Sequence, residues 1–146
     1  MTTSNDLDTL RAAADSGAPD ALFRYATALV AAMRMEEAFD VHSRAAASGH
    51  VGAMIEVGRM HLYGVGTDED VARAVQAFER AEAAGQPVAG YFLALIGLGG
   101  TALPRDEKVA ARLLAAVQAG HPPALRAAAI QFGRKRIAYT LLYSPR

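Results

Sequence analysis

The chain has 146 residues, about the length of one domain, with 52% hydrophobic residues and fifteen basic side chains balanced by fifteen acidic ones. This composition lacks the low hydrophobicity and high net charge of a disordered chain. It also lacks the excess of basic residues that is typical of non-specific nucleic-acid binders. The absence of cysteine excludes disulfides and thiolate chemistry. No apolar run is long enough to span a membrane, and the first residues lack the pattern of a signal peptide, so we expect a cytoplasmic protein.

Four segments of the sequence repeat one pattern, a glycine followed four residues later by an alanine. The glycines are Gly17, Gly49, Gly85 and Gly120, at spacings of 32, 36 and 35 residues, and the alanines are Ala21, Ala53, Ala89 and Ala124. A period near 35 residues fits two short helices with their turns. Glycine suits the end of a helix, and Pro19, Pro87 and Pro122 suit the first turn of the next one. The repeat therefore predicts antiparallel helix pairs.

The spacing of apolar residues between these junctions is helical. We expect helices at residues 6–16, 20–33, 36–48, 52–63, 69–84, 88–98, 106–119 and 123–133. Asp68 and Asp106 are the predicted caps of two of them, because a carboxylate suits the positive end of a helix. No strand-like alternation precedes residue 134. The predicted fold class is all-α, a right-handed superhelix (solenoid) of about three and a half two-helix repeats.

The predicted helical repeat domain covers residues 1–133, and residues 134–146 form an atypical C-terminal tail. Within the domain, an N-terminal helix precedes units at residues 18–49, 50–85, 86–120 and, in part, 121–133.

The unit at residues 50–85 resembles the Sel-one-like repeat (SLR) family, relatives of the tetratricopeptide repeats. The positions that match the family's pattern are Ala53, Val57, Gly58, Gly64, Gly66, Asp70, Ala74, Phe78, Ala81 and Gly85. His61 stands where the family usually has tyrosine, and the next unit has Ala94 in place of the helix glycine. The unit before it lacks the Gly-x-Gly loop. The resemblance extends over residues 10–133 and implies a helical repeat fold.

The resemblance, together with an Ala-rich and Lys-poor composition, implies a bacterial, non-catalytic scaffold that binds a protein or peptide and needs no cofactor. Two alternatives stay open. The chain could be an accessory N-terminal repeat domain cut from a larger enzyme, for example a 2-oxoglutarate-dependent oxygenase. It could also be a hydrolase of the kind reported for the family's cysteine-rich secreted branch, although the missing cysteines argue against that branch.

The polar residues form no recognisable catalytic or metal-binding motif. His42, His50, His61 and His121 lack the paired spacing of zinc ligands. The stretches YGVGTDED and GLGGTALP follow no strand and lack the end of a phosphate-binding loop, so we expect them to join helices. The basic cluster GRKR is too short to indicate nucleic-acid binding. We therefore expect no enzyme activity, no metal and no nucleic-acid partner.

In tetratricopeptide-like arrays, the first helix of each unit lines a concave groove. The repeat positions place the following residues there: Phe23, Thr27, Ile55, Arg59, Tyr63, Tyr91, Leu95, Arg126 and Ile130. Aromatic residues and arginines often anchor interfaces, so this groove is the candidate site for a partner. We expect acidic groups of a bound peptide to pair with Arg59 and Arg126. The alternative is that several of these side chains pack between neighbouring units.

The repeat pattern stops after Gly133, and the tail reads RKRIAYTLLYSPR. Three interpretations of this tail stay open: an altered end of a truncated chain, a segment that folds back over the last helix, or a segment that helps a second copy dock. Residues 1–73 carry a net charge of −5 and residues 74–146 a net charge of +5. This division favours head-to-tail association or a partner specific for one end, and the alternative is that the charges belong to ordinary solvated helix faces. We expect a homo-oligomer formed through the C-terminal end.

Overall fold

The computed structural model describes residues 4–99, 103, 107–124 and 126, in two compact units divided between Ala84 and Gly85. The regular structure within these residues is helical, with no strand among them, and the all-α prediction is confirmed. The division falls at one of the repeat glycines, where one predicted two-helix unit ends and the next begins.

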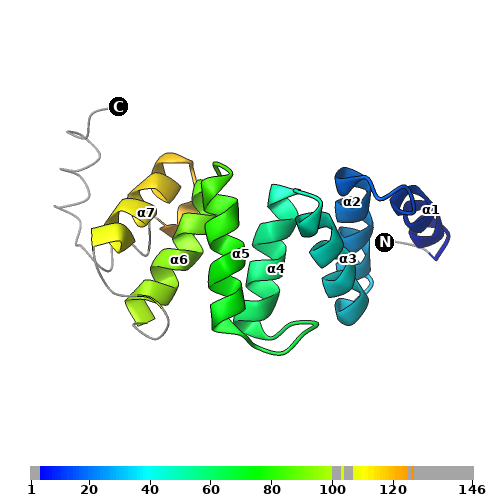
Figure 1. Cartoon of the computed structure of the whole chain (residues 1–146), viewed down its shortest axis with the longest axis horizontal. Helices are drawn as coiled ribbons and strands as arrows, with labels where there is room; N and C mark the ends of the chain where they lie inside the picture. Colours follow the sequence, from blue (N-terminus) through cyan, green and yellow to red (C-terminus); the bar gives the residue numbers. More distant parts are fainter. Residues whose placement is uncertain (1–3, 100–102, 104–106, 125, 127–146) are drawn as a thin grey trace. The chain divides into compact units, whose positions relative to one another are not determined.

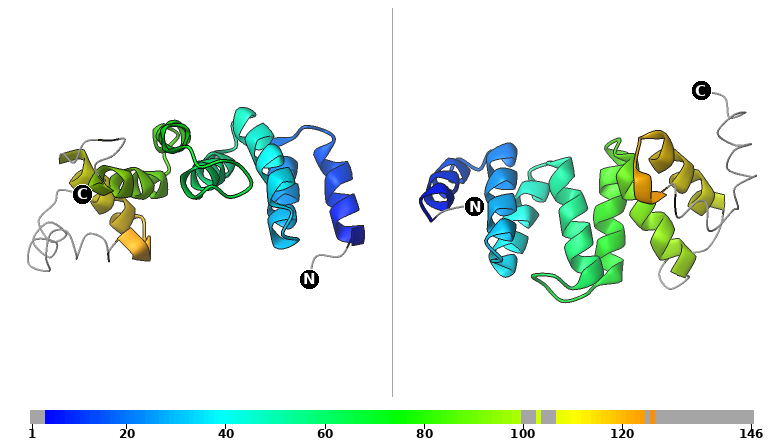
Figure 2. Two further views of the ribbon diagram at one scale, coloured as in Figure 1. Left: turned by 90° about the horizontal axis from the view of Figure 1, so that it is seen from below. Right: turned by 180° about the vertical axis from the view of Figure 1, so that it is seen from behind.

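The first unit is a series of antiparallel helix pairs (Figures 1 and 2). Its helices are α1 (Ser4–Ala14), α2 (Pro19–Ala31), α3 (Met35–Ala47), α4 (Val51–Tyr63) and α5 (Val71–Ala83). Each helix packs against its neighbours in the sequence, because most connections are too short to let the chain do otherwise. The exception is the loop of residues 64–70 between α4 and α5, which is more than twice as long as the connection between α2 and α3.

The second unit pairs α6 (Pro87–Gly99) with α7 (Glu107–Gln118). Its buried core includes Ala94, Val109 and Leu113. The partly buried side chains packed around this core are Tyr91, Leu98 and Val117. The chain is helical again at residues 122–124 and 126, whereas the rest of the predicted helix 123–133 and the predicted cap Asp106 lie outside the described residues.

The helices of the first unit begin and end within two residues of their predicted bounds. The junction glycines adopt the left-handed backbone expected at helix ends, with φ of 77° at Gly17 and 95° at Gly49. Pro19 is the first residue of α2, as expected from its fixed φ.

The predicted cap of α5 was wrong by two positions. Asp70, not Asp68, is the N-cap, and its Oδ1 accepts a hydrogen bond from the Arg73 amide at 3.0 Å. The Asp70 amide in turn donates to the His61 carbonyl at 2.8 Å, which ties the end of the loop back to α4. Asp68 is therefore left on the exposed part of the loop.

Small residues bring α4 and α5 close together. The Phe78 ring of α5 lies directly over Gly58 of α4, and a Cβ at Gly58 would stand 2.6 Å from that ring. Ala53, Ala74 and Ala81 are completely buried. Four of the six matches to the SLR pattern in these two helices are thus small residues that let the fifth, Phe78, pack against a helix backbone.

The other pattern glycine with a clear physical reason is Gly66 in the α4–α5 loop. Its φ is 72°, and a Cβ there would overlap the backbone carbonyl of Met35 at the start of α3. The loop therefore packs against the preceding repeat through backbone atoms, and only glycine allows this approach.

Met33 has the left-handed backbone of a junction glycine but carries a long side chain. It is the one non-glycine residue of the described part with a positive φ, 61°, and it follows α2 in the short turn to α3. Its side chain is 76% exposed and so gains little from packing. This conformation costs an L-residue other than glycine about 1–2 kcal/mol.

Gly58→Ala should destabilise the protein by about 1–3 kcal/mol, because the added methyl group must displace the Phe78 ring. Thermal and urea unfolding followed by circular dichroism measure this change. Gly99→Ala is the matched control, since a Cβ there meets no atom within 4 Å. If both substitutions were equally well tolerated, the close approach of Phe78 to α4 would be contradicted.

Met33→Gly should stabilise the fold by about 1 kcal/mol, because glycine adopts a positive φ without strain. The same unfolding measurement checks this expectation. Met33→Ala keeps the Cβ and its strain, so it should not share the gain. A loss of stability in Met33→Gly larger than in Met33→Ala would contradict the strain at this turn.

Candidate protein-interaction surface

Three of the predicted groove residues lie along one stripe of α4. Ile55, Arg59 and Tyr63 follow one another at four-residue intervals, which places them on the same side of the helix. Arg59 is exposed, Tyr63 is 58% exposed, and Ile55 is half-buried. The Arg59 guanidinium donates to the Glu56 carboxylate at 3.1 Å and so lies along the helix surface. We call Ile55, Arg59 and Tyr63 the α4 face.

Two further predicted residues lie on α2, and they differ in their surroundings. Thr27 is exposed, and its hydroxyl donates to the Phe23 carbonyl at 2.9 Å. Phe23 is half-buried because its ring stacks on the imidazole of His50, with 4.2 Å between ring centroids. Phe23 therefore packs between two helices, as the alternative interpretation of the groove residues allowed.

His50 joins the first helices of two consecutive repeats. Its Nδ1 accepts a hydrogen bond from the Ala53 amide at 3.1 Å and so caps α4. Its Nε2 lies 3.3 Å from Asp20 Oδ1, in the first turn of α2. The sequence did not predict this contact, because histidine is an unusual cap and Asp20 lies far from His50 along the chain.

The second unit repeats part of this arrangement. Tyr91, on α6, lies 4.7 Å from the His121 ring and 5.2 Å from the Phe92 ring, measured between centroids. Tyr91 and Phe23 hold the same repeat position, six residues after a junction glycine, and His121 and His50 each follow the next junction glycine. An aromatic ring therefore lies against a histidine ring at two of the repeat junctions, stacked in the case of Phe23 and His50 and tilted by 59° in the case of Tyr91 and His121.

The remaining predicted groove residues belong to the second unit. Leu95 is half-buried on α6, and Arg126 is exposed. Ile130 lies outside the described residues. Within the first unit, the structure brings Ile55, Arg59 and Tyr63 together on α4.

Two buried histidines complete the core. His42 is 1% exposed and its ring lies 5.5 Å from that of Phe23, while His61 is 6% exposed and meets Phe39 edge-on at 5.1 Å. In each ring Nδ1 is buried without a hydrogen-bond partner among the described residues. Burial lowers the pKa of His42, which favours the neutral imidazole. These histidines pack in the core as aromatic rings, and His61 does so at the position where the SLR family usually has tyrosine.

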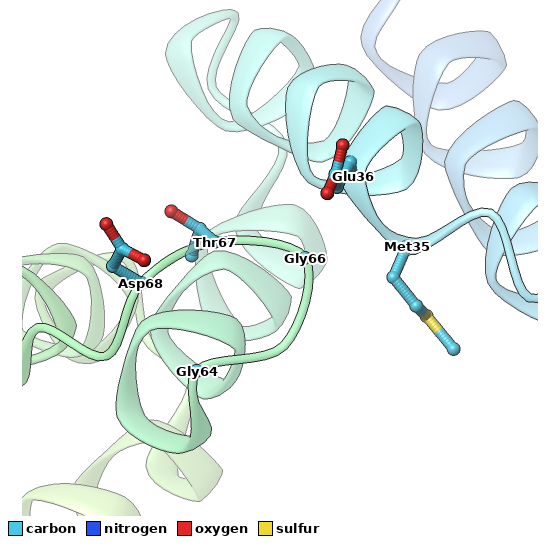
Figure 3. A pocket seen from close by; sticks show the side chains of 6 residues that line it. All are labelled: Met35, Glu36, Gly64, Gly66, Thr67 and Asp68. Carbon is cyan, nitrogen blue, oxygen red and sulfur yellow. The ribbon is translucent and has the colours of Figure 1, made fainter.

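Two open concavities adjoin each other where the α2–α3 turn meets the α4–α5 loop. The larger, of about 470 Å³, is lined by Met35, Glu36, Gly64, Gly66, Thr67 and Asp68 (Figure 3). The smaller, of about 350 Å³, is lined by Met33, Arg34, Met35, Glu36 and Glu37. Neither contains a predicted groove residue. Sequence analysis missed this region, because the loop brings together residues from two repeats.

Within the described ranges, no group of three or more His, Asp or Glu side chains is arranged to hold a metal ion. No helix in the same ranges is long and apolar enough to cross a membrane.

Solved structures of SLR proteins share this fold. A Sel1 repeat protein from Oxalobacter formigenes matches with a TM-score of 0.78 and 25% sequence identity over 91% of the chain. A protective antigen present in uropathogenic Escherichia coli strains, which displays an SLR fold, matches with a TM-score of 0.72 and 24% identity over 78% of the chain. The chain is thus an SLR-like helical repeat protein, and the resemblance seen in the sequence is confirmed.

The chain spans 56% of the Oxalobacter formigenes protein and 26% of the Escherichia coli antigen. No family model matches the sequence, and no curated protein matches it. The likeness to these two structures establishes the fold.

The buried His42 makes stability depend on pH. Its pKa is lowered in the folded protein, so the unfolded chain binds the proton more readily, and stability falls as pH drops below about 6.5. The contribution of His42 is at most about 1.4 kcal/mol per pH unit. Urea unfolding between pH 7 and pH 5 should therefore give a shallower pH dependence for His42→Leu than for the wild type. Equal slopes in the two proteins would contradict a buried, neutral His42.

Proposed function

We propose that this protein is a non-catalytic interaction module that binds a protein or peptide on the α4 face. The observation that carries the proposal is the stripe of Ile55, Arg59 and Tyr63 on the first helix of a repeat. An apolar side chain, an exposed guanidinium and a largely exposed phenol follow one another along about 12 Å of helix. Tyrosine and arginine are enriched among the few interface residues that contribute most of the binding free energy.

The partner best suited to this stripe carries an acidic group beside an apolar or aromatic side chain. A carboxylate of the partner would compete with Glu56 for the Arg59 guanidinium, in a charge-assisted hydrogen bond. The partner's apolar group would cover Ile55 and the Tyr63 ring. Thr27 on α2 is a further candidate contact because it is exposed on the first helix of the preceding repeat.

Tyr91, Leu95 and Arg126 stay in the proposal as the corresponding residues of the second unit, while Phe23 contributes by holding α2 against the start of α4. The similar Sel1 repeat protein from Oxalobacter formigenes is bacterial, which supports the expected bacterial origin. The cytoplasmic location remains a prediction.

The proposal is tested by affinity capture from the source lysate with the double variant Arg59→Glu, Tyr63→Ala. A partner retained by the wild type should be retained at least about tenfold less by the variant, because two anchor residues are lost. Tyr91 is avoided here, since its contacts with His121 and Phe92 make it part of the second unit's packing.

Arg44→Glu is the matched control, because it makes the same change of charge on an exposed position of α3. Circular dichroism melts must show that all three proteins are folded. Equal capture by the wild type and both variants, or no captured partner at all, would contradict binding on the α4 face.

A further inference from the structure

A second surface of the first unit carries features that the proposed function does not use. Two of the three large hydrophobic side chains exposed in the described residues, Met33 and Val65, lie in the α2–α3 turn and the α4–α5 loop. These two segments meet, because Gly66 packs against the Met35 carbonyl. Met33, Met35 and Val65, with Glu36, Asp68 and Glu69, are here called the loop-end patch.

The exposure and the backbone conformation of Met33 are the strongest indication that the loop-end patch is a binding surface. An exposed methionine side chain loses the benefit of burial, and its left-handed backbone adds strain that glycine would avoid. The repeat junctions use glycine for the same conformation, with φ of 77° at Gly17 and 95° at Gly49. Strained residues cluster at functional sites, and the Met33 side chain, 76% exposed, is accessible to a contact outside the unit.

The charge around these apolar side chains is negative. Arg34 is neutralised within the patch's own turn, because its guanidinium makes two hydrogen bonds to the Glu37 carboxylate, at 2.8 and 2.6 Å. Glu36, Asp68 and Glu69 form no ion pair with another described residue. Figure 3 shows Glu36 at the start of α3 and Asp68 on the α4–α5 loop, both among the residues that line the larger concavity, while the Met35 side chain points away from Glu36.

The sequence contains one segment with the complementary chemistry. Residues 134–146 carry four basic side chains and no acidic one, interleaved with Ile137, Leu141 and Leu142 and with two tyrosines. The charge of the whole chain is distributed in the same way, with a net charge of −5 over residues 1–73 and +5 over residues 74–146. Electrostatic complementarity of this kind guides association and selects the partner surface.

We propose that the loop-end patch of one molecule binds residues 134–146 of a second copy of this chain. Apolar side chains of the tail would cover Met33, Met35 and Val65, and its arginines and lysine would pair with Glu36, Asp68 and Glu69. Since the two surfaces differ, the contact is head-to-tail and leaves a free patch at one end and a free tail at the other. This proposal does not depend on binding at the α4 face.

Sedimentation velocity of the full chain across the micromolar range tests the proposal. The wild type should form species larger than a monomer as concentration rises, and added salt should dissociate them because the contact includes exposed charges. Met33→Gly should weaken association at least about tenfold while leaving the fold intact, because glycine suits the local backbone. A wild type that stays monomeric throughout would overturn the proposal.

Neutralising two acids, with Glu36→Gln and Asp68→Asn, should also weaken association. The matched control is Asp15→Asn with Glu79→Gln, which removes the same charge from exposed positions outside the loop-end patch. If the control pair weakened association as much as the patch pair, net charge and not this surface would be responsible, and the proposal would fail.

A mixture of two variants separates this contact from others. Met33→Gly retains the tail but has a defective patch, and Leu141→Ser with Leu142→Ser retains the patch but has a defective tail. Each should be monomeric alone, whereas their mixture should form a one-to-one dimer and no larger species. No dimer in the mixture, or a tail that cross-links to the patch of its own chain in a monomer, would overturn docking between copies.

Discussion

The packing of the first unit depends on the contact between the Phe78 ring and the backbone of α4 at Gly58. The ring is fully buried and lies so close that no side chain at residue 58 would fit. Fully buried alanines of the same two helices, such as Ala53 and Ala81, keep the helices near enough for this contact. Protein interiors are packed as densely as crystals of small organic molecules. A phenylalanine ring in direct contact with helix backbone therefore fixes the distance and orientation of α5 relative to α4.

This tight pair determines what the rest of the unit exposes. With the inner side of α4 buried against α5, Arg59 and Tyr63 lie on the exposed side of α4. The chain must then return to α5 through residues 64–70, and Gly66 packs this loop against Met35 of the preceding repeat. The first unit thus presents two surfaces of different chemistry, the α4 face on one repeat and the loop-end patch built from two repeats.

Much of the fold could be predicted because its signals are local. Glycine at helix ends and proline in first turns mark the junctions, so helix bounds came within two residues in the first unit. The cap at Asp70 was misplaced because TDED offers several acids, and only the three-dimensional course of the loop decides which one reaches the Arg73 amide.

The candidate surfaces were harder to predict, because they depend on contacts between distant residues. Phe23 holds a repeat position typical of a groove, yet its stacking on His50 gives it a packing role. Nothing in the sequence around Met33 indicates a left-handed residue, since the local pattern has no glycine there. The SLR pattern is incomplete outside residues 50–85. This explains why the fold matches solved SLR structures although no family model matches the sequence.

We propose that the protein works through exposed surfaces of its first unit, and that the loop-end patch is one of them. Two-dimensional amide NMR spectra of the full chain, recorded on dilution, test it most directly. The account predicts that signals of residues 33–36, 64–69 and 134–146 shift together with concentration while those of Arg59 and Tyr63 do not. Spectra that do not change on dilution, or shifts centred on the α4 face, would contradict it.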